Sequence, residues 1–241
     1  MKKQKKVNIF LWTVPLVNSI ARSIYDVAFI WLILDMTNSE KITGFVAMTT
    51  YFPAIIFGLF IGSIVDLFPK TKMISFVTIM QGLVLLCIPL LFFYNIESVW
   101  LIMLLAFFHN GFGLPLVPAF NAYLPTQIKK ENLLKANSIV NISWQTAVLI
   151  GPIIAAQLLT FYPVENLFYF CVFFYFFAAA LSTIAPIDTV EKEEINAKKI
   201  IEKTREGLQY LKERAILRVI IILTLLSNLF VILIYSSLLF A

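Results

Sequence analysis

Long apolar segments alternate with short polar ones along almost the whole chain. A transmembrane helix needs about 20 consecutive, mostly apolar residues, and seven segments reach roughly that length. The sequence therefore predicts seven membrane-spanning helices and an all-α membrane protein. The expected spans are Ile9–Leu34, Gly44–Val65, Met73–Tyr94, Val99–Tyr123, Leu133–Tyr162, Leu167–Pro186 and Val219–Phe240.

The polar segments carry the basic residues on one side of the predicted membrane. Of the 19 Lys and Arg residues, all except Arg22 and Lys41 lie at the N-terminus, in or beside the second and fourth loops, or in 188–218. Cytoplasmic loops of membrane proteins are enriched in Lys and Arg. We therefore predict a multi-pass protein of the cell membrane whose N-terminus and 188–218 stretch are cytoplasmic. The net charge of +5 then reflects topology, and no nucleic-acid partner is expected.

Composition excludes other classes of protein. Hydrophobic residues make up 60% of the chain and charged residues 14%, whereas soluble domains have about 45–50% and about 25%. Such a chain can neither bury its apolar surface in one soluble core nor remain disordered. Motifs for phosphate, zinc or nucleophile chemistry are missing from the sequence, and Cys87, Cys171 and His109 are far apart in it. We therefore expect no enzyme activity, no metal and no cofactor.

Six closely spaced spans precede one long polar stretch and a last apolar segment. We expect a six-span bundle over 1–187, a cytoplasmic linker over 188–218, and a seventh span over 219–241. Apolar or small residues in the linker follow helical spacing at Ile201, Thr204, Leu208, Leu211 and Ala215. This pattern suits an amphipathic helix on an anionic membrane surface, and a solvated linker is the alternative.

The first span contains two charged residues, which are costly inside a membrane and usually functional there. Arg22 and Asp26 are four residues apart and so share one helix face. They could be a self-neutralising pair that only makes burial tolerable. They could instead form the polar wall of a substrate or proton pathway.

The fourth span contains the single histidine of the chain, His109, followed by a run of helix breakers. Histidine titrates near neutral pH, so His109 is a candidate for proton coupling if it faces water. A packed, neutral histidine is the alternative. The breakers Gly111, Gly113, Pro115 and Pro118 predict irregular backbone, which at membrane depth survives beside protein or a water-filled cavity.

The fifth span carries a polar stripe on one helix face. Its members, Asn137, Asn141 and Gln145, are spaced four residues apart. Such a stripe could line a central cavity or hold two helices together by hydrogen bonds between them.

The stretch FVAMTTYFPAIIFGLFIGSIVDLFPKTK covers most of the predicted second span and the loop after it. It resembles the corresponding region of the third drug:proton antiporter group of the major facilitator superfamily, which includes macrolide-efflux proteins and enterobactin exporters. Gly62 and Asp66 match the superfamily loop pattern, and Lys70 keeps one of its charges. In the family this loop latches the cytoplasmic gate. Asp66 also ends its helix as a carboxylate, so it needs a positive partner such as Lys70 or Lys72.

Further stretches carry the same resemblance. The segments VPAFNAYLP and LLKANS look like the signature of the loop between spans four and five. His109 stands where the family has an Arg linked to proton coupling. Gly151 and Pro152 match the Gly-Pro of the antiporter signature in the fifth span.

The resemblance implies a fold and a function. Family members have two six-span halves, each of two inverted three-helix repeats, with the substrate site between the halves. We expect this chain to be the first half plus one helix, in a bacterial proton-coupled exporter of drugs or other small molecules. Its expected partners are a hydrophobic or amphiphilic substrate, protons, the lipid bilayer, and a missing second half or a second chain. The alternative is a membrane interaction or assembly protein, or an inactive fragment, that does not transport.

Overall fold

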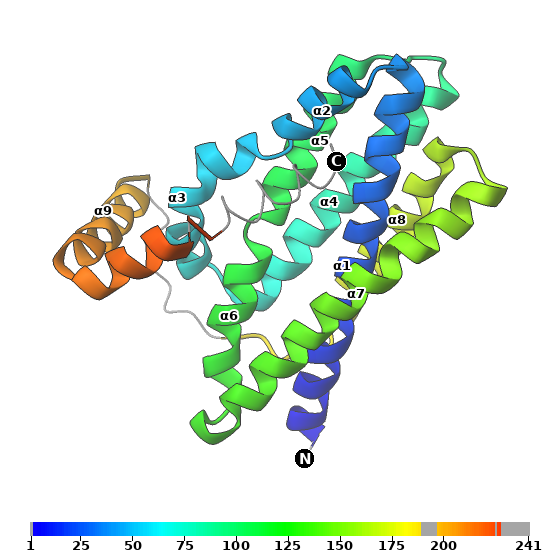
Figure 1. Cartoon of the computed structure of the whole chain (residues 1–241). Helices are drawn as coiled ribbons and strands as arrows, with labels where there is room; N and C mark the ends of the chain where they lie inside the picture. Colours follow the sequence, from blue (N-terminus) through cyan, green and yellow to red (C-terminus); the bar gives the residue numbers. More distant parts are fainter. Residues whose placement is uncertain (1, 189–196, 225, 228–241) are drawn as a thin grey trace. The chain divides into compact units, whose positions relative to one another are not determined.

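The structure is a computed structural model that describes residues 2–188, 197–224, 226 and 227, and these residues form helices and connecting turns without strands (Figure 1). The chain divides into two compact units, Met1–Glu193 and Glu194–Ala241. The helices of the first unit are α1 (Lys2–Thr37), α2 (Glu40–Thr49), α3 (Phe52–Leu67), α4 (Lys70–Phe93), α5 (Val99–Gly113), α6 (Leu116–Gln127), α7 (Leu133–Phe161) and α8 (Leu167–Ser182), with short 3₁₀ turns at Lys130–Asn132 and Val164–Asn166.

Six segments of the first unit are long and apolar enough to cross a membrane: α1, α2 with α3, α4, α5 with α6, α7, and α8. They confirm the first six predicted spans. The seventh prediction, Val219–Phe240, lies mostly outside the described residues. A short apolar helix spans Ala215–Thr224 and so includes the first described residues of that predicted span.

Two of the spans are broken into two helices. The second span breaks between Thr49 and Phe52, where Pro53 lies in the first turn of α3 and supplies no N–H. One continuous helix was predicted over Gly44–Val65, and the structure corrects this prediction because Pro53 interrupts the helical hydrogen bonding. The fourth span breaks at Leu114 and Pro115, as the cluster of glycines and prolines predicted.

Tight turns join the spans at the end of the bundle far from the N-terminus. Asn38, between α1 and α2, and Asn95, between α4 and α5, both have positive φ angles, of 48° and 56°. Asn tolerates this left-handed conformation better than most residues. Ser39 then caps α2 by accepting a hydrogen bond from the Ile42 N–H. These turns let consecutive spans run antiparallel.

Helix α1 lies beside α7 and α8 (Figure 1). The crossing with α7 depends on Gly151, because a Cβ placed there would overlap the Cβ of Ser23. Helix α4 packs on α8 in a similar way, and a Cβ at Gly82 would lie 3.3 Å from the Cβ of Tyr175. Small residues thus set the closest helix contacts, as is usual in membrane bundles.

The apolar core of the bundle consists of two separate clusters. One lies toward the N-terminal end of α1 and includes Phe10, Val77, Phe120 and Tyr123. The other contains the later part of α1, the second half of α4, and α8. The buried polar residues Asn18, Thr78, Gln81 and Ser143 belong to neither cluster. We call these four residues the polar layer; within it, the Asn18 amide donates to the Thr78 hydroxyl at 3.3 Å.

In the second unit, α9 (Ala197–Glu213) is an amphipathic helix within the predicted linker 188–218. Gln209 donates a hydrogen bond to Glu213, and the Arg214 guanidinium lies 4.5 Å from the centre of the Tyr210 ring. Of the predicted apolar stripe, Ile201 is exposed. Residues 189–196 of the linker lie outside the described part.

Candidate functional site

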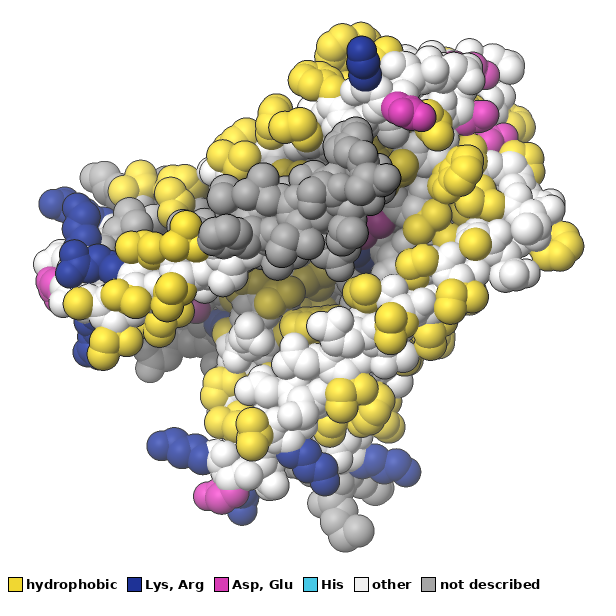
Figure 2. All heavy atoms as spheres, viewed as in Figure 1, with side chains coloured by type: hydrophobic (Ala, Val, Ile, Leu, Met, Phe, Trp, Pro, Cys, Tyr) yellow, Lys and Arg dark blue, Asp and Glu magenta, His cyan; other side chains and the backbone are white. Residues whose placement is uncertain are grey.

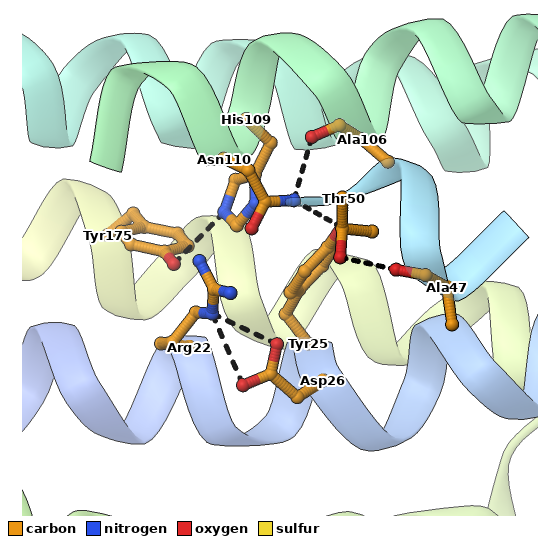
Figure 3. A network of polar contacts seen from close by, with 9 residues as sticks. All are labelled: Arg22, Tyr25, Asp26, Ala47, Thr50, Ala106, His109, Asn110 and Tyr175. Carbon is orange, nitrogen blue, oxygen red and sulfur yellow. Dashed lines mark hydrogen bonds and ion pairs between the residues drawn. The ribbon is translucent and has the colours of Figure 1, made fainter. Parts of the chain in front are cut away.

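The ion pair predicted in the first span is present. The Arg22 Nε donates to both carboxylate oxygens of Asp26, at 2.9 and 3.2 Å (Figure 3). The side chains are 40% and 53% exposed, so the pair is not sealed in the core. The Arg22 guanidinium also lies 5.5 Å from the centre of the Tyr25 ring. The ion pair is thus partly exposed and lies outside the buried polar layer.

A pocket of about 220 Å³ opens beside Arg22 and the break in the fourth span. Its polar wall is made by α1 and α4, and its apolar wall by α6 and α7. The lining residues are Pro15, Asn18, Ser19, Arg22, Gln81, Gly113, Leu116, Val117, Phe120 and Trp144. Of these residues, Arg22 and Gly113 were candidates from the sequence, whereas Asn18, Gln81 and Trp144 were not. An amide in the middle of an apolar span was the available signal for Gln81.

His109 is fully buried next to this pocket and does not line it. Its Nε2 lies 3.0 Å from the Tyr175 hydroxyl, and its ring centre lies 4.1 Å from that of Tyr25 (Figure 3). Asn110 donates to the Tyr25 hydroxyl at 3.3 Å and to the Ala106 carbonyl at 2.8 Å. The two tyrosines and Asn110 were not found from the sequence. The two tyrosines contact the buried histidine ring.

The polar stripe of the fifth span lies on the exposed face of α7. Asn137, Asn141 and Gln145 are all exposed, and the Asn141 amide donates back to the Asn137 carbonyl at 3.0 Å. None of the three lines the pocket beside Arg22. The opposite face of α7 packs on α1, where the Ser143 hydroxyl contacts the Trp12 carbonyl at 3.2 Å.

The predicted gate loop joins α3 to α4. Gly62 and Asp66 are exposed, and a Cβ on Gly62 would meet open space. The Lys70 ammonium donates to the backbone carbonyls of Asp66 and Phe68, at 3.3 and 3.2 Å. The ammonium therefore caps the end of α3, where carbonyls lack helical partners. The expected pairing of Lys70 with the Asp66 carboxylate is absent from the ion pairs of the described residues.

Asp188 attaches the end of the sixth span to this loop, which the sequence did not predict. Its carboxylate accepts hydrogen bonds from the Lys70 N–H at 2.8 Å, the Thr71 N–H at 3.1 Å and the Thr71 hydroxyl at 3.2 Å. Asp188 is only 3% exposed. It therefore supplies the N-terminal cap of α4 that Pro69, the residue at the cap position, cannot provide.

The six apolar spans and the pocket between them describe a multi-pass helical membrane protein. Within the described residues, His, Cys, Asp and Glu side chains form no group that could hold a metal ion. The Major Facilitator Superfamily profile matches residues 11–241, and the chain belongs to this superfamily of transporters.

Two curated relatives are both called Macrolide efflux protein A, one from Streptococcus pyogenes and one from its serotype M6 strain. Each is 23% identical over 148 residues, which is 61% of this chain and 36% of the relative. The chain thus matches about a third of the length of these relatives.

Proposed function

We propose that the chain forms the first half of a proton-coupled exporter of drugs or other small molecules. The observation that carries this proposal is the pocket lined by Arg22, whose partly exposed side chain forms an ion pair with Asp26. Charged groups inside membrane proteins commonly mark substrate or proton pathways. The names of the macrolide-efflux relatives favour export and a drug-like substrate.

The ion pair offers a simple means of coupling. When Asp26 binds a proton, its attraction for Arg22 weakens and the guanidinium becomes available to other acceptors. When the carboxylate loses the proton, the pair forms again. In this proposal His109 supports the tyrosines behind the pair, and the exposed α7 stripe belongs to a wider pathway. Gly62, Asp66 and Lys70 act at the gate.

Charge distribution supports a cytoplasmic N-terminus in the cell membrane. Figure 2 shows Lys and Arg side chains gathered at the end of the bundle where the chain begins, and acidic side chains at the opposite end. Exposed basic residues of the first end include Lys5, Lys72, Lys129 and Lys135. This excess of basic residues supports a cytoplasmic location for this end, because cytoplasmic loops are enriched in Lys and Arg.

The test compares the chain alone with a complete transporter. In a complete protein, made by joining residues 1–218 to the second half of a macrolide-efflux relative, we expect an imposed pH gradient to lower macrolide accumulation in cells. We expect the chain alone to give no efflux, because alternating access requires two bundles.

Exchanging the pair, as Arg22→Asp with Asp26→Arg, should abolish gradient-driven efflux while membrane insertion persists. If the exchange leaves efflux intact, the pair only neutralises itself and the coupling proposal is wrong. If efflux by the joined protein without these substitutions does not depend on the pH gradient, the proposed proton coupling is also wrong.

A further inference from the structure

A larger, apolar pocket lies where α3, α4 and the broken fourth span meet. It has a volume of about 580 Å³ and shares no lining residue with the pocket beside Arg22. Its apolar walls include Phe68, Met73 and Phe76. Among the described residues that line it, Lys72 is the only charged one. The pocket is therefore an apolar space with a single cationic group.

This pocket continues into a smaller one of about 260 Å³. The two pockets share the lining residues Ile61, Ile64, Gly111 and Phe112. Gly111 has no side chain that would divide them. We call the two pockets together the lateral groove.

The length of the lateral groove matches one leaflet of a bilayer. Phe57 lines the smaller pocket, and Phe68, eleven residues further along the second span, lines the larger one. Helical residues rise about 1.5 Å each, so these positions are about 16 Å apart along α3. The hydrocarbon core of a bilayer is about 30 Å thick, so one leaflet is about 15 Å. A spanning helix needs the full thickness and is about 10–12 Å wide. The groove therefore fits one acyl chain better than it fits a helix.

Lys72 supplies a positive charge to this groove. Its side chain is exposed and forms no ion pair with an acid among the described residues. It lies in the first turn of α4, at the end of the bundle that carries the exposed Lys5, Lys129 and Lys135. Lysine side chains lay their alkyl stem on apolar surface and keep the ammonium in the polar interface. Basic pockets between transmembrane helices on the cytoplasmic side bind anionic lipid headgroups. The charge of Lys72 therefore complements an anionic headgroup.

We propose that the lateral groove binds an anionic phospholipid of the leaflet on the Lys72 side. The headgroup phosphate pairs with the Lys72 ammonium, and one acyl chain lies along α3, past Ile64 and Phe112 toward Phe57. Zwitterionic lipids bind less tightly, because their own cation competes with Lys72 for the phosphate. The inference does not depend on transport by the chain, and it uses the proposed orientation only to place this lipid in the cytoplasmic leaflet.

The experiment measures lipid selectivity at the groove in the full 241-residue chain in lipid nanodiscs. The four native Trp residues are replaced by Phe, and Phe76→Trp, at a lining position that is 54% exposed, supplies the only fluorescent reporter. Bromine on an acyl chain quenches Trp fluorescence on contact. Dibrominated phosphatidylglycerol, which is anionic, and dibrominated phosphatidylcholine, which is zwitterionic, are each titrated against unbrominated phosphatidylcholine. A chain that keeps only Trp100, which is 76% exposed and lines neither pocket, reports ordinary lipid contact.

We expect the Phe76→Trp reporter to prefer phosphatidylglycerol about fivefold, the contribution of one basic residue at an anionic surface. A second reporter, Phe57→Trp, should show the same preference, because the acyl chain reaches it. The Trp100 reporter should show none. Lys72→Gln should abolish the preference at the Phe76→Trp reporter. Lys129→Gln, an exposed lysine of the same end that lines neither pocket, is the matched control and should leave the preference intact.

Each contrary result overturns a stated part of the proposal. If the Phe76→Trp and Trp100 reporters show equal preference, the groove is ordinary lipid-exposed surface and not a site. If Lys72→Gln and Lys129→Gln have equal effects, Lys72 does not hold the headgroup. If only the Phe57→Trp reporter lacks the preference, the acyl chain does not follow the groove. If neither brominated lipid quenches the Phe76→Trp reporter, a protein segment or a second copy covers the groove. Unfolding of each variant in SDS establishes that a lost preference is not a lost fold, and none of these results bears on the transport proposal.

Discussion

Removing the carboxylate of Asp188 should destabilise the bundle although this residue lies beyond the last predicted span of the first unit. Its oxygens accept three hydrogen bonds, two from the first backbone N–H groups of α4 and one from the Thr71 hydroxyl. The donors Lys70 and Thr71 are themselves buried. In Asp188→Ala these N–H groups lose their acceptor, and the positive end of the α4 dipole loses a compensating charge.

The expected loss follows from these contacts. Leaving a buried donor unsatisfied costs about 1–3 kcal/mol, and deleting a helix N-cap costs about 0.5–2 kcal/mol. The two descriptions overlap, so we expect Asp188→Ala to lower the free energy of unfolding by about 2–4 kcal/mol. Asp188→Asn keeps one acceptor oxygen but no charge, and should lose about 1–2 kcal/mol.

Reversible unfolding by SDS in mixed micelles, followed by far-ultraviolet circular dichroism, measures these differences. Asp35→Ala is the matched control, since Asp35 is an exposed aspartate near the end of α1. It should stay within about 0.5 kcal/mol of the parent chain. If Asp188→Ala is no less stable than Asp35→Ala, the carboxylate does not hold the end of the sixth span to α4, and the reasoning fails.

Two further predictions concern helix packing and topology. Gly151→Ala should lower the free energy of unfolding by about 1–3 kcal/mol in the same assay, because its new methyl group forces α1 and α7 apart at Ser23. A Cβ at Gly58 meets open space, so the control Gly58→Ala should be nearly neutral. Equal losses of stability in the two variants would contradict the close crossing of α1 and α7. Single cysteines at Ser39 and Lys198, in a chain without its native cysteines, should differ in labelling by an impermeant thiol reagent on whole cells. Position 39 should react and position 198 should not, and the reverse pattern would overturn the proposed orientation.

The sequence by itself determined the spans, because their ends are set by polar or helix-breaking residues. The fifth span was predicted over Leu133–Tyr162 and is α7, Leu133–Phe161. The Arg22–Asp26 pair was also predictable, since residues four apart on one helix always meet on the same face. The break at Pro115 follows from its missing N–H. Each of these is a local property of the chain.

Only the tertiary structure decided which residues meet across spans. Asp188 accepts a hydrogen bond from Lys70, 118 positions away in the sequence, and Gln81 and Arg22, on different helices, line the same pocket. His109, a candidate for a water-facing group, is packed against two tyrosines instead. The physical reason is that a membrane helix is apolar both toward lipid and toward its neighbours. Its sequence pattern therefore leaves its rotation in the bundle undetermined, and packing at small residues such as Gly151 sets that rotation.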